Sequence, residues 1–542
     1  MARRRRRREL GQRSSTSGCS LLPSANNNFK LYHCRTDCGG TLHIVRENCA
    51  KPPAVSDDKW LNAYAATAAG ADAFRVRLLA AGAVVMVAMH RHKPCAYTGD
   101  YRLSEAPPSG RVAVLEALHL HDGGAGLDER NPKWAPLRAS ALVLPNTTVR
   151  APRCARSPHA AALPACVGGG EAGRWEVASA SAGAAASAPP PTLHPFWASG
   201  CVYSCPLAPK CGGGAQAQFW ADMQPYRNAT SAAAVAPGLA LRWTPFRCRY
   251  PNLARGTSGA AAVASCLAGR RVLFLGDSQM RPLEISFLRA LPGGYQCTAK
   301  DNTKYGLRQC EGRAGDGAKV TTLYLWNPFG TLKVLNKTKI GLKAGDVLVI
   351  NFGQHPASGQ HWPTSRYLGA LHETVDDLRR VAAAQRAKGA PLRAVWSSTP
   401  AFPLRCEGPV VQKKDWRTEP RTLLYNALAS PLMLAHGIPF VDYHALTWPL
   451  SHAAKDHAHF FSEPFISAAG VALLNSICGA ELSGKGKGGG GGEDPGALDP
   501  RALADGGAKS FGWLAGARRA YGSGAMRVLQ PKVPGRKAGE GA

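Results

Sequence analysis

The sequence predicts an α/β protein with a mostly parallel central sheet, preceded by a small β-rich domain. After residue 269, short apolar runs alternate with longer segments whose apolar residues repeat at helical spacing. This alternation is typical of parallel strands whose connecting helices cover both faces of the sheet. Between residues 60 and 152 the apolar runs are short and are separated by glycine, proline and aspartate. Such punctuation favours antiparallel strands, as in a sandwich.

The elements follow from these patterns in chain order. In the β-rich domain, strands are predicted at 74–79, 83–89, 112–120 and 137–144. In the α/β region, strands are predicted at 272–275, 320–326, 347–351, 392–397 and 439–442. Helices are predicted at 282–291, 366–388, 420–436 and 464–478.

Composition divides the chain into five parts. Residues 1–58 are basic and polar and are expected to be mostly disordered, and residues 59–155 form the β-rich domain. Residues 156–200 contain a cysteine–tryptophan element and a linker rich in alanine, serine and proline. Residues 201–482 form the α/β domain, and residues 483–542 are expected to be a disordered tail rich in glycine and lysine.

The formal net charge of the 542-residue chain is +30, from 66 lysines and arginines against 36 acidic residues. Such a surplus suits an acidic polysaccharide, an anionic membrane surface or nucleic acid. Aromatic residues are not interleaved with the basic residues of the tail, so nucleic acid is not the expected partner. The run of six arginines at residues 3–8 keeps a nuclear, nucleic-acid-binding protein as an alternative.

Sixteen cysteines, spread from Cys19 to Cys478, favour disulfides and a place in the secretory pathway, either the Golgi lumen or the extracellular space. Cys201, Cys205 and Cys211 suit disulfides better than a metal site, because no histidine or second close pair completes a tetrahedral set. No bound metal is predicted. No signal peptide is recognisable, and the longest apolar run, 12 residues at 78–89, is too short to span a bilayer. Membrane association would need a segment that this sequence does not show.

The strand predicted at 272–275 runs directly into Gly276, Asp277 and Ser278. Ser278 is therefore expected between the carboxyl end of a strand and the amino end of a helix, where backbone N–H groups and the helix dipole favour a developing anion. This is a suitable place for a nucleophile. The alternative is a loop in which Ser278 only caps the helix.

A serine nucleophile needs a base, and a carboxylate commonly orients that base. Asp456 and His459 lie three residues apart, after the last predicted strand and before the last predicted helix, so Asp456 can hold the imidazole of His459. His459 is the preferred base, while His457 and His452 compete with it on spacing alone. The alternative is an ordinary polar loop.

A third predicted strand ends on a polar residue. The apolar run that begins at Val347 ends on Asn351, and Gly353 and His355 follow. The side-chain amide of Asn351 can donate to an oxyanion together with the backbone N–H of Ser278, since both lie at the carboxyl ends of strands. The alternative is an asparagine that only forms a turn.

These residues together resemble the PC-esterase domain of the trichome-birefringence-like polysaccharide O-acetyltransferases, which is related to the SGNH/GDSL hydrolases. The resemblance covers residues 165–480. The residues that carry it are Cys166, Gly173, Trp175, Arg242, Trp243, Pro245, Cys248, Leu267 to Arg271, Gly276, Asp277, Ser278, Arg281, Asn351, Gly353, Asp456 and His459. Pro282 stands where the plant family usually has asparagine, and Phe460 follows His459 where it has tryptophan. The pattern of Asp456, His459 and Phe460, together with the preceding β domain, is similar to that of neurexophilin and PC-esterase domain proteins.

The resemblance implies an SGNH-like three-layer sandwich in which Ser278 is the nucleophile, His459 the base and Asp456 the acid that orients it. Ser278, Asn351 and Gly353 would form the oxyanion hole. The residues expected to support this site are Gly276, Asp277, Arg281 and His355.

The activity implied is transfer of an acetyl group to hydroxyls of a polysaccharide or other glycan, acidic or neutral, through an acetyl-serine intermediate. The acetyl donor, acetyl-CoA or another acetylated compound, would be a co-substrate, and no bound cofactor is predicted. An acetylesterase, which uses water as the acceptor, and a non-catalytic glycan-binding matrix protein are the alternatives.

Overall fold

The computed structural model describes about half of the chain, in both the β-rich and the α/β regions. The described residues are 19–24, 26–36, 39–48, 72–80, 83–87, 89–93, 95–102, 112–122, 142–150, 163–166, 168–177, 241–302, 307–314, 317–337, 340–343, 345–358, 362–389, 391–402, 417–448, 458–461 and 464–482.

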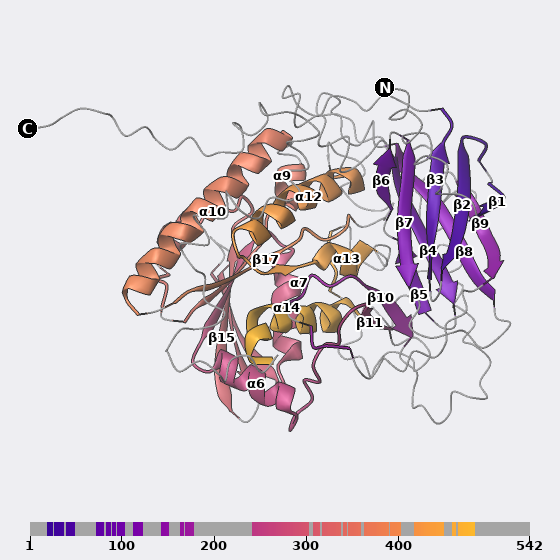
Figure 1. Ribbon diagram of the computed structural model, residues 1–542. Helices are drawn as coiled ribbons and strands as arrows, with labels where there is room; N and C mark the ends of the chain where they lie inside the picture. The colour runs from indigo at the N-terminus through magenta and orange to yellow at the C-terminus, as the bar shows by residue number, and fades with distance from the viewer. Residues whose placement is uncertain are drawn as a thin grey trace, which may run out of the picture.

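The α/β region is built on a seven-stranded sheet of order β13-β14-β15-β12-β16-β17-β18 (Figure 1). The strands from β15 to β18 are parallel, and β13 and β14 add an antiparallel hairpin at one edge. The bounds are β12 (Arg271–Gly276), β13 (Tyr295–Asn302), β14 (Leu307–Ala314), β15 (Ala318–Trp326), β16 (Val347–Ile350), β17 (Arg393–Ser397) and β18 (Phe440–Val441). The predicted α/β class with a mostly parallel sheet is confirmed.

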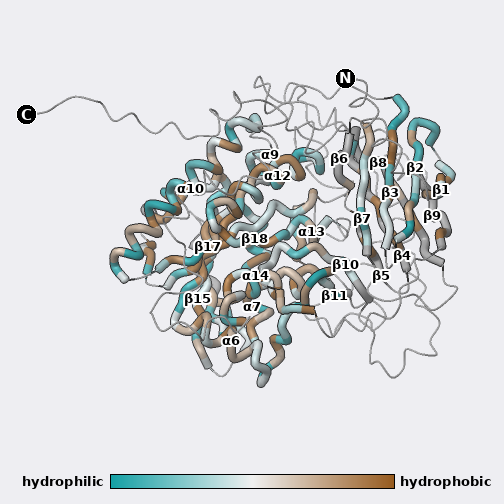
Figure 2. Tube along the Cα trace, in the orientation of Figure 1, coloured by the Kyte–Doolittle hydropathy of each residue, from teal (hydrophilic) through white to brown (hydrophobic). Residues whose placement is uncertain are grey.

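Helices cover both faces of this sheet because side chains of the central strands alternate between two buried clusters. Val272 and Phe274 of β12 pack against α6, α7 and α14, whereas Leu273 and Leu275 pack against α10 and α12. Figure 2 shows hydrophilic and hydrophobic stretches alternating along α10, as expected for a helix with one face on the sheet. The bounds are α6 (Ser258–Leu267), α7 (Met280–Ala290), α8 (Lys333–Lys337), α9 (Gln354–Ala357), α10 (Thr364–Ala387), α12 (Glu419–Ala435), α13 (Tyr443–Thr447) and α14 (Phe465–Leu482).

The β-rich region consists of two antiparallel sheets, with strand orders β1-β2-β3-β7-β6 and β11-β10-β5-β4-β8-β9. Strands of both sheets contribute to one buried cluster, so the sheets pack face to face as a sandwich. The bounds are β1 (Cys19–Leu22), β2 (Phe29–Thr36), β3 (Gly39–Arg46), β4 (Asp72–Ala80), β5 (Ala83–Val87), β6 (His90–Lys93), β7 (Ala96–Arg102), β8 (Val112–Asp122), β9 (Leu142–Arg150), β10 (Gly173–Val177) and β11 (Leu241–Pro245).

Strands β1, β2 and β3 lie within residues 1–58, a stretch predicted to be mostly disordered, so its part from Cys19 to Arg46 supplies ordered strands to the sandwich. Phe29 and Leu31 of β2 and Leu42 and Ile44 of β3 alternate with polar residues and point into the sandwich core. Only a few apolar residues are needed for such half-buried strands, so the polar composition was misleading. The strand predicted at 137–144 overlaps β9 (Leu142–Arg150) at residues 142–144, and its first five residues lie outside the described residues.

Strands β10 and β11 connect the sandwich to the α/β region. By hydrogen bonding they belong to a sandwich sheet, since β10 pairs with β5 and with β11. By side-chain packing they belong to the α/β core: Trp175 of β10 is fully buried and its indole N–H donates to the carbonyl of Leu446 at 3.1 Å. Its ring also meets Trp243 of β11 and Phe465 of α14 edge to face. The two regions therefore share buried side chains.

Disulfide bonds join several described segments, as predicted from the number of cysteines. They are Cys19–Cys34, Cys166–Cys248, Cys266–Cys478 and Cys297–Cys310. Such bonds form and persist in the oxidising compartments of the secretory pathway or outside the cell.

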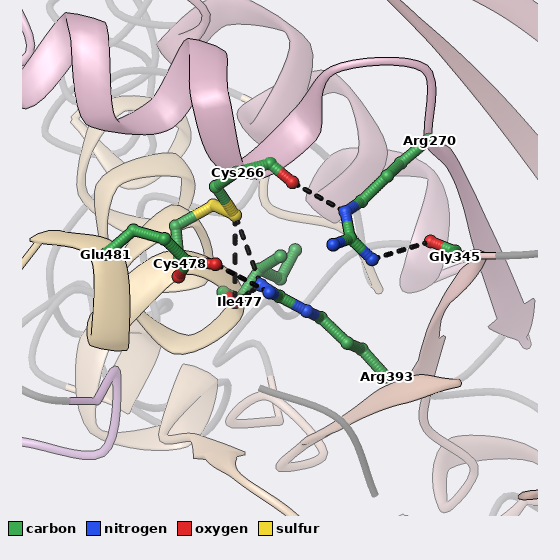
Figure 3. The surroundings of a disulfide bond; sticks show 7 residues. All are labelled: Cys266, Arg270, Gly345, Arg393, Ile477, Cys478 and Glu481. Atoms are coloured by element: carbon green, nitrogen blue, oxygen red, sulfur yellow. Dashed lines mark hydrogen bonds and ion pairs between the residues drawn. A yellow bond between two sulfur atoms is a disulfide. The ribbon is translucent and has the colours of Figure 1, made fainter. Parts of the chain in front are cut away.

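The Cys266–Cys478 disulfide ties α6 to the end of α14 (Figure 3). Beside it, the buried guanidinium of Arg393 donates to the carbonyl of Ile477 at 2.8 Å and pairs with Glu481 at 2.6 Å. These contacts use carbonyl and carboxylate groups at the helix end that need donors. The carboxyl end of α14 is therefore firmly attached to β17.

Among the described helices, α14 alone is long and apolar enough to cross a membrane, with a mean hydropathy of 1.5. It is nevertheless a core helix, because it packs against α7 and α6 in the buried cluster. Gly470 approaches the Ser286 carbonyl of α7 so closely that no larger side chain would fit.

We expect Cys266→Ser with Cys478→Ser to lower the free energy of unfolding by about 2–5 kcal/mol, because the bond restricts a long stretch of the unfolded chain. Its cysteines are 212 residues apart, against 13 for Cys297–Cys310. The matched double variant of Cys297 and Cys310 should therefore lose less stability. Denaturant unfolding measures both losses, and equal losses would contradict the expectation.

Candidate functional site

The carboxyl edge of the parallel strands gathers most of the residues singled out in the sequence. In chain order the parallel strands run β12, β15, β16, β17, β18, but β12 lies between β15 and β16 in the sheet. The chain thus turns to opposite sides after β12 and after β15. Such a reversal of strand order is where ligands bind in open α/β sheets. Ser278 follows β12 and Asn351 follows β16, one on each side of this point.

The loop that carries Ser278 is held tightly between its neighbours. A side chain at Gly276 would overlap the carbonyl of Asn351, so glycine is required there. The carbonyl of Gly276 accepts from the backbone N–H of Asn327, at 2.6 Å. These contacts fix the end of β12 against both flanking strand ends.

Ser278 does not cap α7. The helix begins at Met280, and its N-cap residue, Gln279, makes no side-chain capping bond. Instead a carboxylate oxygen of Asp277 accepts from the backbone N–H of Gln279 at 2.9 Å. Neither the hydroxyl nor the backbone N–H of half-buried Ser278 forms a hydrogen bond with another described residue. Both groups remain available for a reacting carbonyl group.

His459 is brought to this loop by its neighbour in the chain. The side-chain amide of Gln279 donates to the carbonyl of Ala458, and both residues are buried. Ser278 directly precedes Gln279 and His459 directly follows Ala458, so this hydrogen bond brings the segments of Ser278 and His459 together. His459 is half-buried, with Nε2 shielded from solvent, and its ring lies against that of Phe461.

The proposed orienting acid, Asp456, lies outside the described residues, as do the competing bases His457 and His452. Its pairing with His459 therefore stays a prediction.

Asp277 is a carboxyl group wholly enclosed by protein. One carboxylate oxygen accepts from Gln279, while the other finds no partner within the described part of the chain. Burial raises the pKa of Asp277 above its ordinary value, because the charged form is poorly solvated there. The backbone N–H of Gln279 and the nearby side chains of His355, His459 and Arg417 oppose this shift in pKa.

Asn351 lies where the prediction places it, but its amide faces β17. It is 1% exposed, and Nδ2 donates to the carbonyl of Ser397 at 2.8 Å and to Oγ1 of Thr399 at 3.3 Å. To donate to an oxyanion, the amide would have to give up the longer contact, with Thr399. The same Thr399 side chain leaves no room for a side chain at Gly353, which precedes α9.

The remaining supporting residues flank the loop. His355, in α9, is half-buried and lies edge to face with Trp326 at the end of β15, with ring centres 4.9 Å apart. Arg281 is exposed in the first turn of α7, within electrostatic reach of Glu284 and Tyr324. The backbone N–H of Arg281 also donates to the carbonyl of Ser278 at 3.2 Å, so Arg281 is attached to the loop itself.

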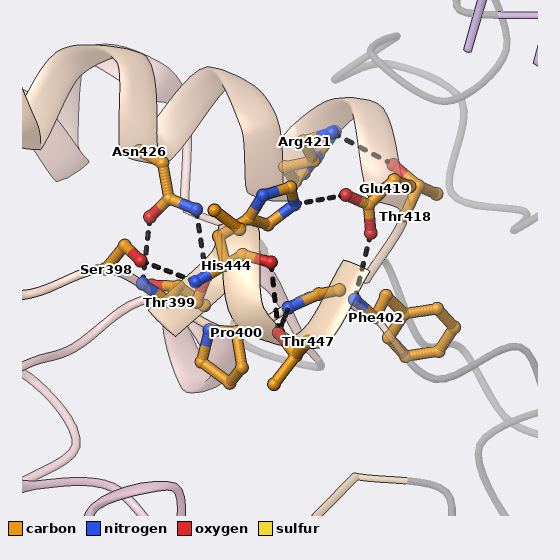
Figure 4. Close-up of polar contacts among 12 residues, drawn as sticks. Ser398, Thr399, Pro400, Phe402, Thr418, Glu419, Arg421, Asn426, His444 and Thr447 are labelled. Atoms are coloured by element: carbon orange, nitrogen blue, oxygen red, sulfur yellow. Dashed lines mark hydrogen bonds and ion pairs between the residues drawn. The ribbon is translucent and has the colours of Figure 1, made fainter. Parts of the chain in front are cut away.

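A buried polar network holds the segment after β17 in place (Figure 4). Thr399 exchanges two backbone hydrogen bonds with the side chain of Asn426, both at 2.8 Å. Glu419 accepts from the backbone of Phe402 and binds His444. Burial alone would lower the pKa of His444, but the adjacent Glu419 carboxylate raises it above the ordinary value. The network fixes Thr399 and, through it, Asn351.

Gln279, Thr399 and Trp326 were not among the site residues predicted from the sequence. Thr399 and Trp326 lie at the ends of predicted strands, so the reasoning applied to Ser278 and Asn351 could have found them. Gln279 and Ala458 are 179 residues apart in the chain, and no local sequence pattern predicts the contact between them.

The described residues show one cluster of groups of the kinds that bind metal ions, formed by Cys19, Cys34 and His43 in the sandwich. The two cysteines form a disulfide, which removes their thiolates as ligands.

No protein-family model and no curated protein sequence matches the chain. The resemblance to the PC-esterase domain therefore rests on the spaced motifs alone.

We expect Asp277→Asn to raise the free energy of unfolding at neutral pH by about 1 kcal/mol or more, because asparagine keeps an acceptor for Gln279 and removes the cost of either burying a carboxylate or protonating it. Since the pKa of Asp277 is raised in the folded state, ionisation favours the unfolded chain. The difference between variant and wild type should be smallest below the ordinary pKa of 3.8, grow as the pH rises from there to the folded-state pKa, and stay constant above it.

Denaturant unfolding at a series of pH values measures this difference. Asp376→Asn is the matched control, because that carboxylate is partly exposed on α10. A difference for Asp277→Asn that is independent of pH, or a variant less stable than wild type at neutral pH, would contradict the assignment.

Proposed function

We propose that the chain is a serine-dependent O-acetyltransferase with an SGNH-like catalytic domain, which acetylates hydroxyls of a glycan through an acetyl-serine intermediate. The hydrogen bond between Gln279 and Ala458 carries the proposal, because it puts the candidate nucleophile and the candidate base at one sheet edge. The strand order and the layers of helices on both faces support the SGNH-like class.

In the first half of the reaction, Oγ of Ser278 attacks the carbonyl carbon of the acetyl donor while His459 takes the hydroxyl proton. The carbonyl oxygen becomes an oxyanion near the backbone N–H of Ser278, with Asn351 as the second donor. Collapse of this intermediate breaks the bond to the leaving group, which receives the proton from His459. The products of this half are the deacetylated donor and acetyl-serine.

In the second half, His459 removes the proton of a glycan hydroxyl, whose oxygen attacks the acetyl carbon. The bond to Ser278 breaks, and the serine oxygen recovers its proton from His459. Asp456, as the orienting acid, would stabilise the imidazolium form of His459 in both halves. If water takes the place of the glycan hydroxyl, the same steps hydrolyse the ester.

The surroundings fit a glycan substrate in the secretory pathway. The disulfides suit an oxidising lumen or the extracellular space, of which the Golgi lumen is the proposed location. The net charge of +30 suits an acidic glycan. Acetyl-CoA or another acetylated compound would serve as the donor.

We expect Ser278→Ala to lower acetyl transfer to a glycan by about 10³-fold or more, because the covalent intermediate can no longer form. His459→Ala should lower it comparably, and the double variant should be little worse than either, since the two residues act together. The purified full chain is supplied with an acetylated donor and a set of glycans, and acetate release and glycan acetylation are both measured.

Ser365→Ala, on the exposed surface of α10, is the matched control and should retain full activity. Transfer that persists in Ser278→Ala would refute the nucleophile. Acetate release without glycan acetylation in the wild type would identify an acetylesterase instead.

A further inference from the structure

A stack of planar side chains lies at the same sheet edge as Ser278. Phe329 follows β15, Trp362 precedes α10, and Arg366 lies in the first turn of α10. The rings of Phe329 and Trp362 stack with centres 5.3 Å apart and planes 20° apart. The guanidinium of Arg366 lies over the Trp362 ring, 4.4 Å from its centre. We call these three residues the aromatic stack.

The aromatic stack is rigid at its centre and exposed at its outer members. Trp362 is 6% exposed, and its backbone N–H and carbonyl bind Pro356 and the hydroxyl of Tyr425, each at 2.8 Å. Its indole N–H is buried and has no partner among the described residues. Phe329, by contrast, is 36% exposed. Trp362 therefore holds an exposed ring in a fixed place.

Arg366 is exposed, and no described carboxylate lies within ion-pair distance of it. A guanidinium whose carbon lies over an aromatic ring can still donate its N–H groups to other partners. Its edge can bind a carboxylate through two parallel hydrogen bonds. The aromatic stack therefore offers an apolar face next to a cation that is available to an anion.

Short connections link the aromatic stack to the loop of Ser278. Asn327, two residues before Phe329, donates its backbone N–H to the carbonyl of Gly276. Gly330, the residue after Phe329, packs so closely on the ring of Phe352 that a side chain would not fit, and Phe352 directly follows Asn351. The loop after β15 thus touches both strand ends that form the candidate site.

We propose that the aromatic stack is a binding subsite for a pyranose ring of an acidic glycan, the acceptor in the proposed reaction on which this inference rests. The C–H face of the sugar packs on the exposed ring of Phe329, whose electron-rich face attracts polarised C–H groups. The carboxylate of a uronic acid residue binds Arg366. The assignment names the substrate class: a polysaccharide with uronic acid residues.

Other exposed apolar residues do not share these features. Leu434 on α12 is 57% exposed but has no stacked aromatic partner or adjacent cation among its described contacts, and single exposed residues of this kind are common on protein surfaces. Leu434 therefore serves as a matched control for Phe329. Arg379, which pairs with Asp376 on the outer side of α10, serves as the control for Arg366.

The test is direct binding, measured by isothermal titration with the full chain at physiological ionic strength, which screens non-specific attraction to a basic protein. The probes are a short oligogalacturonate and a neutral galacto-oligosaccharide of the same length. We expect the wild type to bind the uronate more tightly. Phe329→Ala should weaken binding of both probes by about tenfold, and Arg366→Gln should weaken only the uronate, also by about tenfold.

Leu434→Ala and Arg379→Gln should bind both probes as the wild type does, and unchanged thermal unfolding of Arg366→Gln shows that its effect is not a loss of folding. The inference is overturned if the wild type binds neither probe, if both stack variants bind as the wild type does, or if the control variants weaken binding equally. Because binding is measured without turnover, the two proposals can fail separately. If Ser278 proves not to be the nucleophile, the proposed reaction is refuted, but the binding result still decides whether the aromatic stack is a glycan subsite.

Discussion

A buried hydrogen bond between the side-chain amide of Gln279 and the carbonyl of Ala458 is the contact on which the proposed chemistry depends. It joins the loop after the first parallel strand to the segment before the last helix, which are far apart in the chain. Leaving either group unpaired in the interior would cost about 1–3 kcal/mol, so the bond favours one arrangement of the two segments. Ser278 and His459 owe their shared location to this constraint.

Both ends of α14 are fixed, and this gives the segment of His459 a stable base. The Cys266–Cys478 bond and Arg393 hold the carboxyl end, while Phe460 and Phe465 pack against each other near the amino end. On the other side of the site, the side chain of Asn426 holds Thr399 by two hydrogen bonds, and the Glu419–His444 pair holds the adjacent Ser398 through the backbone N–H of His444. Thr399 in turn contacts Asn351. The site is thus assembled on rigid elements, as precise positioning of reacting groups requires.

Local patterns in the sequence predicted most of the α/β region, and long-range contacts account for what they missed. The apolar runs and helical repeats placed β12, β15, β16, β17, α10, α12 and α14 close to their observed bounds, because periodicity reflects burial on a sheet. The same logic placed Ser278 and Asn351 at strand ends. It could not show that the amide of Asn351 faces β17, that Gln279 binds Ala458, or that Trp175 joins the two regions, since each contact depends on a distant segment. Polar composition also hid the strands between Cys19 and Arg46.

The central claim is that Ser278 is a nucleophile activated by His459, and covalent labelling tests it most directly. The full chain is treated with a fluorophosphonate, which reacts with activated serines, and the modified peptide is identified by mass spectrometry. The account predicts labelling at Ser278 in the wild type and a large loss of labelling in His459→Ala. Labelling at a different serine, no labelling, or labelling of Ser278 that is unchanged in His459→Ala would contradict it.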